Sequence, residues 1–273
     1  MITTLFCCPL CHAPLLPTGK SYLCSAHHTF DIARQGYVNL LTGRTAQQHG
    51  DNKNMICARR DFLSAGYYHS LMDKVASIAC HYAFPGCRIL DAGCGECSYT
   101  DRIAGALLSR GISCDILGID ISREALAIGG KKNQMLALAV ASLYHLPLAD
   151  ESIDLLFEIF APHCNEEYHR VLSRGGKMIM VIPGARHLFG LKEVLYATPY
   201  ENEVADTELE GFELLEHISM REEITLSNET DLWNLFTMTP YFYRTPPNQK
   251  EKLRQSAPLS TEIAFEILVY EKK

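Results

Sequence analysis

Between residues 88 and 120, two glycines and two aspartates have the spacing that is typical of a cofactor-binding site. Asp91 comes directly after the apolar residues of a short predicted strand, and Gly93 and Gly95 follow it in a turn. Glycines in such a turn let a ligand approach backbone N–H groups that a Cβ would otherwise shield. A second apolar run ends at Asp120, where an acid at the strand tip can accept hydrogen bonds from both hydroxyls of a ribose. These four residues therefore predict the site of a cofactor that contains a ribose.

Four soft metal ligands occur in two pairs within the first 30 residues. Cys8 and Cys11 enclose the dipeptide Pro-Leu, and this CxxC knuckle places two thiolates on one side of a tetrahedral ion. Cys24 and a histidine close the tetrahedron; His27 and His28 both follow Cys24 closely, and the spacing leaves both open. Because so short a unit has little core, a bound zinc ion would contribute most of its folding free energy.

Strands and helices must alternate to bring the glycines and acids to one edge of a sheet. Strands are predicted at 88–91, 115–119, 135–140, 153–159 and 177–182, the last behind Gly175 and Gly176. Helices are predicted between them at 97–109, 122–130 and 164–172, and a short loop and helix precede the strand at 153. This alternation predicts an α/β fold with right-handed crossovers and a parallel sheet whose carboxyl edge binds the ligand.

The flanking segments complete this sheet and cover the glycine turn. Apolar residues at helical spacing over 55–80 predict two helices that break at Gly66, and the polar run 42–54 predicts a linker ahead of them. Beyond the alternating region we expect a helix, a strand, a second helix and a last strand, at 188–196, 213–225, 228–238 and 263–270. Aromatic residues over 239–244 either line an acceptor pocket or belong to the core behind the sheet.

Composition limits the class of protein. The chain has 273 residues, a mean hydropathy of −0.03 and no apolar run near the ~20 residues of a membrane span. The N-terminus lacks a charged stretch followed by an apolar core, so we expect a cytoplasmic protein. Eleven cysteines in such a protein favour metal ligands and free thiols over disulfides.

The net charge of −7 is distributed unevenly. Residues 201–273 carry 15 acids and 7 bases, a balance of −8, which leaves 17 acids and 18 bases, a balance of +1, for residues 1–200. Five bases lie near the cysteine-rich unit, where a polyanion could dock. An ordinary solvated face is the alternative of equal weight. The five bases are Arg34, Arg44, Lys53, Arg59 and Arg60.

Several segments resemble known enzymes. The glycine turn resembles motif I of class I S-adenosylmethionine (SAM) methyltransferases, with Cys97 in place of the third glycine; a nicotinamide site would instead have glycine where Ser98 stands. From Cys8 to about Pro240, rarer segments resemble the bacterial 23S rRNA guanine-N1-methyltransferases, a family that includes enzymes of tylosin-type macrolide resistance. These segments read CPLC…CxxxH, FDIARQGYVNLL, ARRDFLSAGYY, DAGCGE, FAPHCNEEYHRVL, PGARHL and MTP.

The resemblance implies a class I methyltransferase fold, a Rossmann-like α/β sheet, with a small N-terminal zinc-binding domain. It implies a zinc-binding RNA-recognition domain over 1–35, a linker with cofactor-covering helices over 36–80, and a SAM-dependent methyltransferase domain over 81–273. SAM and Zn²⁺ are the implied cofactors, and a 23S rRNA hairpin and a second copy of the chain are the implied partners. The fourth zinc ligand of the family maps to His28, and its cofactor contacts map to Tyr68, Gly95, Glu96 and His187.

The implied reaction transfers a methyl group to N1 of a guanine. This atom faces the Watson–Crick partner and carries a proton, so the base must be extruded and the proton must leave. Glu158, at a strand end, is our candidate for the general base, with His163 second. The main alternative is a methyltransferase on a small molecule or protein, with the zinc unit as a dimer scaffold; a zinc-binding RNA module without activity is the third. We also expect a chain that lacks residues 1–35 to fold and bind SAM.

Overall fold

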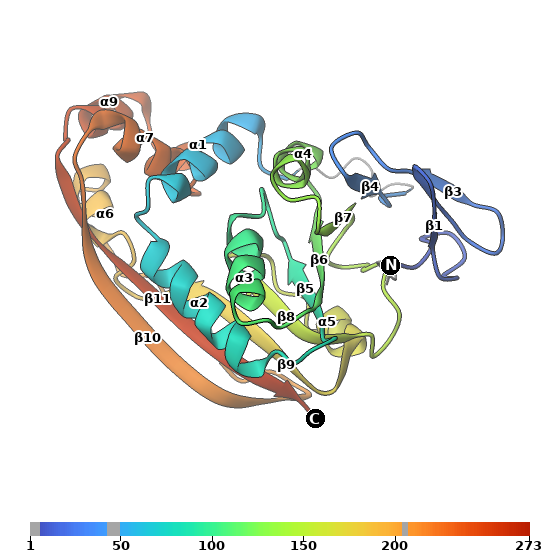
Figure 1. The fold of residues 1–273 in the computed structure, drawn as a ribbon. Coiled ribbons are helices and arrows are strands. Elements are labelled where there is room, and N and C mark those ends of the chain that lie inside the picture. The colour runs from blue at the N-terminus through green and yellow to red at the C-terminus, as the bar shows by residue number, and fades with distance from the viewer. Residues whose placement is uncertain (1–5, 43–49, 204–206) are drawn as a thin grey trace.

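The computed structural model describes residues 6–42, 50–203 and 207–273, and two β-sheets organise them (Figure 1). Arg44 and much of the predicted linker lie outside these residues. The strands are β1 (Leu16–Thr18), β2 (Ser21–Leu23), β3 (Thr29–Asp31), β4 (Tyr37–Asn39), β5 (Arg88–Ala92), β6 (Asp115–Asp120), β7 (Ala137–Val140), β8 (Ile153–Ile159), β9 (Leu172–Pro183), β10 (Phe212–Leu226) and β11 (Leu259–Lys272). The helices are α1 (Lys53–Ser64), α2 (His69–Tyr82), α3 (Ser98–Ser109), α4 (Arg123–Lys132), α5 (Asn165–Val171), α6 (Phe189–Leu195), α7 (Glu229–Thr237), α8 (Tyr241–Arg244) and α9 (Pro247–Arg254).

The larger sheet has the strand order β10-β11-β9-β8-β5-β6-β7-β4. Strands from β4 to β9 pair in parallel, whereas β11 is antiparallel to both β9 and β10. The chain builds β6 and β7 on one side of β5 and then β8 and β9 on the other, so the order reverses between β5 and β8. Open sheets of this kind bind ligands at the carboxyl edge beside such a reversal. The predicted α/β fold is confirmed.

Most elements end within two residues of their predicted limits, but β9 begins earlier than predicted. Leu172 pairs with Ile153 and Lys177 pairs with Leu155, so β9 carries extra residues in a bulge between these pairs. Gly175 lies in the bulge with a φ of +71°, which glycine adopts without strain. The glycine pair therefore interrupts this strand and does not precede it.

The short helix predicted ahead of β8 is absent from the described chain, and this prediction was wrong. Residues 141–152 form turns, and Pro147 among them cannot donate the backbone hydrogen bond that a helix requires. The zinc-binding unit covers this part of the sheet instead. Phe6 forms an antiparallel bridge with Leu148, and the Cys7 N–H donates to the Pro147 carbonyl at 2.7 Å.

The zinc-binding unit and this face of the large sheet share one core. Phe6 and Leu15 are buried in the same hydrophobic cluster as Leu90 and Ala139 of the sheet. The chain then enters the large sheet itself, because β4 pairs in parallel with β7. The predicted linker segment after residue 36 thus contributes an edge strand, which the sequence did not indicate.

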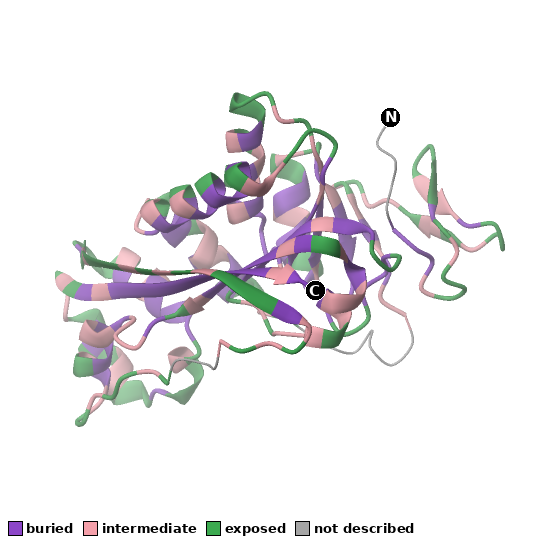
Figure 2. Ribbon diagram, turned by 90° about the horizontal axis from the view of Figure 1, so that it is seen from below, coloured by how far each residue is buried: buried purple, intermediate pink, exposed green. Residues whose placement is uncertain are grey.

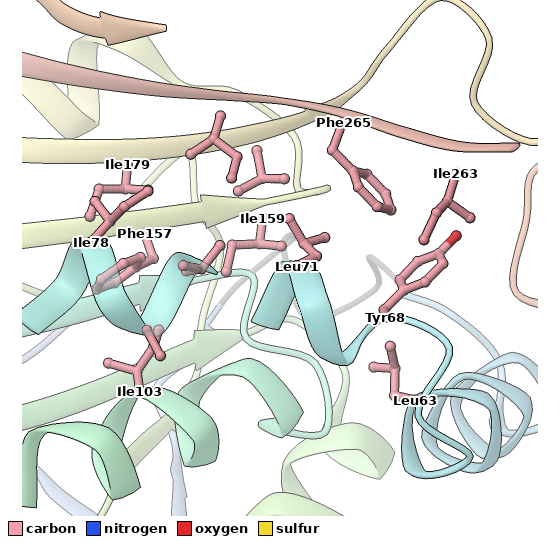
Figure 3. Close-up of a cluster of buried hydrophobic side chains, with 14 of the residues drawn as sticks. Leu63, Tyr68, Leu71, Ile78, Ile103, Phe157, Ile159, Ile179, Ile263 and Phe265 are labelled. Carbon is pink, nitrogen blue, oxygen red and sulfur yellow. The ribbon is translucent and has the colours of Figure 1, made fainter. Parts of the chain in front are cut away.

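Helices cover the opposite face of the large sheet. There α2 and α3 pack on the strands, and Leu71, Ile103, Phe157 and Ile179 meet in the cluster of Figure 3. Helices α7 and α9 lie at the other end of the molecule from the zinc-binding unit (Figure 1). Strand β10 forms the outer edge of the sheet and is largely exposed or half-buried along its length (Figure 2). Among the described residues, no helix combines the length and apolar character that crossing a membrane requires.

Candidate cofactor cleft and zinc site

The glycine loop lies at the carboxyl edge of β5, beside the reversal in strand order. Gly93 has a φ of +83°, and a Cβ there would come within 2.6 Å of the Ala161 Cβ, so a side chain does not fit. The Gly95 N–H donates to Asp120 Oδ2 at 2.9 Å, and the Ser122 N–H donates to Oδ1 at 2.7 Å. The Asp120 carboxylate thereby holds the loop, and its other lone pairs can still accept ribose hydroxyls.

Cys97 takes the place of the third motif-I glycine and also its conformation. Its φ of +64° is in the left-handed region, directly before α3. The buried Cys97 side chain packs against α4, where a Cβ on Gly129 would come within 2.4 Å of the Cys97 sulfur. A glycine on the neighbouring helix therefore makes room for the side chain that the loop has gained.

Three carboxylates gather around the loop. The residues Asp91 and Glu96 are only 2% and 3% exposed. The Thr100 hydroxyl donates to Asp91 Oδ2, but burial outweighs this bond and raises the pKa of Asp91 to about 7. Burial also raises the pKa of Asp120. The loop therefore lies in an acidic cleft, which favours a cofactor that carries positive charge.

Arg59 reaches this cleft from α1. Its Nη1 lies 3.7 Å from the position that a Cβ on Gly95 would occupy, and its guanidinium forms an ion pair with Asp51. Burial lowers the pKa of Arg59, but the neighbouring carboxylates of Asp51, Glu96 and Asp120 outweigh it and raise the pKa overall. The interpretation of Arg59 as a base for a docked polyanion was therefore wrong, because α1 turns its side chain toward the cofactor loop.

The other bases of that group differ from Arg59. Arg60 forms an ion pair with Asp61, with 43% of its side chain exposed. Arg34 and Lys53 are exposed at the surface. These three residues keep the position that contact with a polyanion requires.

Tyr68 and His187 meet near the carboxyl edge, on the side of β8, β9 and β11. The Ala264 N–H donates to His187 Nδ1 at 3.3 Å, so the neutral ring carries its proton on Nε2 and donates it to Tyr68 Oη at 3.3 Å. Burial lowers the pKa of His187 to about 4, which keeps the ring uncharged at neutral pH. The Tyr68 ring packs against Phe265 with centroids 5.0 Å apart (Figure 3). Because both ring nitrogens of the half-buried His187 are engaged, that residue offers mainly its ring face to a ligand, whereas Tyr68 is only 2% exposed and packs behind it.

Glu158 and His163, the two candidates for the general base, form one hydrogen-bonded pair. His163 Nδ1–H donates to Glu158 Oε2 at 2.7 Å, and this bond raises the pKa of His163. Glu158 lies opposite Ala92 of β5 and shares a strand face with Leu156, on the side of the sheet that the zinc-binding unit covers. The pair therefore stands at the strand reversal, on the other face from Tyr68.

The four predicted metal ligands converge in the zinc-binding unit. Their ligand atoms all lie within 4.8 Å of one another, and the Cys11 and Cys24 sulfurs are 3.6 Å apart. Zinc with bonds of ~2.3 Å to sulfur has tetrahedron edges of roughly 3.8 Å, so the cluster has the right size. His27 is exposed, has a φ of +63° and is not in the cluster. The residues that could hold the ion are Cys8, Cys11, Cys24 and His28.

Two aromatic residues at the cleft were not singled out in the sequence. The Tyr99 hydroxyl, on α3, is buried without a hydrogen-bond partner in the described part of the chain. Phe160 follows β8 with a φ of +53° and is 44% exposed. Phe242, from the aromatic run 239–244, instead packs against Trp233 with centroids 5.9 Å apart. Phe242 is partly buried against the core, whereas Tyr243 of the same run is 61% exposed, so the run as a whole is not core.

Comparison with known proteins defines the class. Residues 6–45 match the zinc-ribbon family described as RlmA, N-terminal, and residues 90–180 match the methyltransferase domain family. The crystal structure of the YcgJ protein from Bacillus subtilis superposes with a TM-score of 0.50 at 14% identity, over 75% of this chain and 99% of that one, which shows a shared fold alone. Fold and family matches together define a SAM-dependent methyltransferase with an N-terminal zinc ribbon.

Relatives define the family. A putative 23S rRNA (guanine-N(1)-)-methyltransferase of Micromonospora griseorubida is 33% identical over 264 residues, which are 88% of this chain and 87% of that protein. The 23S rRNA (guanine(748)-N(1))-methyltransferase of Streptomyces fradiae is 28% identical over 95% of this chain and 93% of that protein. The chain belongs to the 23S rRNA (guanine-N1)-methyltransferase family.

Proposed function

We propose that this enzyme methylates N1 of a guanine in a hairpin of 23S rRNA, with SAM as the methyl donor. The observation that carries the proposal is the 33% identity to the Micromonospora griseorubida protein over 88% of the chain. The sheet and the glycine loop are common to methyltransferases of different substrate classes, so they do not select the substrate. The family match that extends to the ribbon over residues 6–45 is what favours rRNA over a small molecule.

The cleft provides groups for each part of the cofactor. Bound SAM supplies a methyl group that its sulfonium makes electrophilic. Asp120 would accept the ribose hydroxyls. The N–H groups of Gly93, Cys94 and Gly95 already donate to Ile119 and Asp120, so within the glycine loop the Glu96 N–H, just ahead of α3, would bind the cofactor carboxylate. Glu96, which is 3% exposed, places negative charge beside the positive groups of the cofactor. Tyr68 and His187 would line the cleft on the side of β8, from where the acceptor approaches.

The target base has to leave its helix before its N1 can reach the methyl group. The N1 proton also needs an acceptor within hydrogen-bond reach. Glu158 remains our candidate, and the hydrogen bond from His163 Nδ1–H to its carboxylate raises the pKa of His163. The proton would pass to this pair at the end of β8.

The zinc ribbon would hold one structural ion through Cys8, Cys11, Cys24 and His28, because four protein ligands complete the tetrahedron. We assign RNA recognition to this ribbon together with Arg34, Lys53 and Arg60.

A homodimer, which the family resemblance implies, would double the RNA-binding surface. Sedimentation equilibrium tests whether the chain forms this dimer. Expression in a macrolide-sensitive strain tests whether tylosin-type resistance follows.

One experiment separates the candidate functions. Tritiated methyl transfer from SAM is measured with unmodified 23S rRNA fragments, and primer extension maps the product nucleotide. We expect one guanine in a hairpin to block extension, because N1-methylation prevents Watson–Crick pairing. Transfer to a small molecule or protein with none to RNA would replace this proposal with the alternative, in which the ribbon is a dimer scaffold.

A further inference from the structure

Two aromatic rings lie nearly parallel to each other at the carboxyl edge of β8 and β9. The rings of Phe160 and His187 are inclined by only 25°, and their centroids are 6.5 Å apart. A flat base that touches both faces at ~3.5 Å needs roughly 7 Å between them. The spacing is therefore close to that of a slot for one planar base.

Phe265 closes the inner side of this slot. Its centroid lies 5.7 Å from Phe160 and 4.9 Å from His187, and it is tilted by 51° to both rings. Phe265 is 1% exposed, whereas Phe160 is 44% exposed, so the slot opens outward along Phe160. A base would enter from solvent and stop against Phe265.

The chemistry of the walls suits an uncharged aromatic ligand. Both ring nitrogens of His187 are engaged, Nδ1 by the Ala264 N–H and Nε2 by Tyr68 Oη, so His187 presents its ring face. The ring of Tyr99 stands beside Phe160 with centroids 6.5 Å apart, and its buried hydroxyl has no hydrogen-bond partner among the described residues. That hydroxyl can bind a polar edge of a ligand.

The position of the slot decides between two occupants, the adenine of the cofactor and the acceptor base. Asp120, which would bind the ribose, ends β6, and the strand order places β6 on one side of β5. Phe160 follows β8, His187 follows β9 and Phe265 lies in β11, and these three strands are all on the other side of β5. The adenine follows the ribose toward β7, so the slot is left for the acceptor.

From this geometry we propose that Phe160 and His187 sandwich the extruded guanine and that Phe160 is the residue that holds it for methyl transfer. This inference rests on the proposed function and names the acceptor subsite within it. The left-handed backbone of Phe160, with a φ of +53°, turns its ring out of the strand and over the slot.

The test compares three substitutions at position 160 in the full-length, zinc-loaded enzyme. Phe160→Leu and Phe160→Ala remove the ring, whereas Phe160→Tyr keeps it. Loss of one base–aromatic stack should lower the single-turnover rate on the rRNA hairpin roughly 10- to 100-fold, and tyrosine should restore it to within about threefold. SAM affinity by calorimetry should change less than about twofold, because Phe160 lies on the β8 side of the cleft and Asp120, the expected ribose ligand, lies on the β6 side. Phe84 is an exposed phenylalanine just ahead of β5, at the amino edge of the sheet. The matched control Phe84→Leu should keep the wild-type rate.

Each outcome has a distinct meaning. A wild-type rate in Phe160→Leu would overturn the slot while leaving the proposed function in place. A tenfold loss of SAM affinity in that variant would also overturn it, because the ring would then belong to the cofactor site. If the wild-type enzyme itself transfers no methyl group to guanine N1, the proposed function fails first, and that result does not depend on Phe160. Thermal melting of each variant checks that it is folded.

Discussion

Phe6 of the zinc ribbon pairs with Leu148 of the methyltransferase domain in an antiparallel bridge. Two of the zinc-ligand candidates, Cys8 and Cys24, belong to the same buried cluster as the strand residue Leu90. The ribbon therefore fills the place of a helix on one face of the sheet. The expectation that a chain without residues 1–35 would fold and bind SAM remains untested, and this contact argues against it because the truncation would expose the core of the sheet to water.

Loss of the zinc ion should consequently destabilise the whole molecule. His28→Asn removes one ligand candidate, and we expect it to abolish stoichiometric zinc and lower the Tm by roughly 10 °C or more, since a structural ion contributes several kcal/mol to folding. His27→Asn is the matched control, because asparagine tolerates the φ of +63° at this position. Atomic spectroscopy and thermal unfolding measure the two effects. Full zinc content in His28→Asn would exclude it as a ligand.

The sequence was sufficient for features that depend on local spacing. The apolar runs of β5 and β8 stand out because both sheet faces are covered, and the CxxC knuckle of Cys8 and Cys11 lies within four consecutive residues. Contacts between distant segments were not predictable in the same way. The bridge from Phe6 to Leu148, which replaces a helix, depends on how two segments more than a hundred residues apart pack.

Side-chain direction was also beyond the sequence. The charge of Arg59 indicated a polyanion, but the orientation of α1 decides that its guanidinium meets the glycine loop. Phe160 reads as one more apolar residue at a strand end, and only its φ of +53° turns the ring outward. Glu158 and His163 were weighed as separate candidates, although they form a single pair.

Asp91 should make stability depend on pH. Burial raises its pKa to about 7 from ~3.9 in the unfolded chain, so the folded protein holds a proton that the unfolded chain has lost between these values. The contribution of protonated Asp91 to the free energy of unfolding is complete below pH ~4 and is lost as pH rises to 7. About 2–3 kcal/mol of this contribution is lost between pH 5 and pH 7. Asp91→Asn should remove that part of the slope. Denaturant unfolding at pH 5 and pH 8 compares the two proteins, and parallel losses would show that Asp91 does not titrate as expected.

Asp120 should contribute to SAM affinity in two ways, through the ribose hydroxyls and through the bonds that hold Gly95 and Ser122. Asp120→Ala should weaken SAM binding by roughly 1–3 kcal/mol, because the hydroxyls lose a charged acceptor. Titration calorimetry measures the change. Unchanged affinity would rule out Asp120 as the ribose acid.

Glu158 should affect the chemical step more than binding. Glu158→Gln keeps the size of the side chain but removes the carboxylate that His163 binds. If this pair takes the N1 proton, the single-turnover rate at pH 7 should fall about 100-fold or more, with SAM affinity unchanged. The wild-type rate should rise with pH as His163, whose pKa the bond with Glu158 raises, loses its proton, and the variant should lack this rise. A loss of less than tenfold would leave Glu158 only a structural role beside His163.

Arg59 should set the preference between the cofactor and its demethylated product. SAM carries a net charge of +1 and S-adenosylhomocysteine carries none, whereas the carboxylate and ammonium groups are common to both. Arg59 is a cation beside the glycine loop at Gly95, so it disfavours the sulfonium without any matching effect on the product. Arg59→Ala should therefore raise the ratio of the product Kd to the SAM Kd by about fivefold, for a charge–charge term of the order of 1 kcal/mol. The control is Arg60→Ala, at the neighbouring residue, which is paired with Asp61; it should leave the ratio of the product Kd to the SAM Kd unchanged. If calorimetry finds equal ratios in both variants, Arg59 lies too far from the sulfonium to act on it.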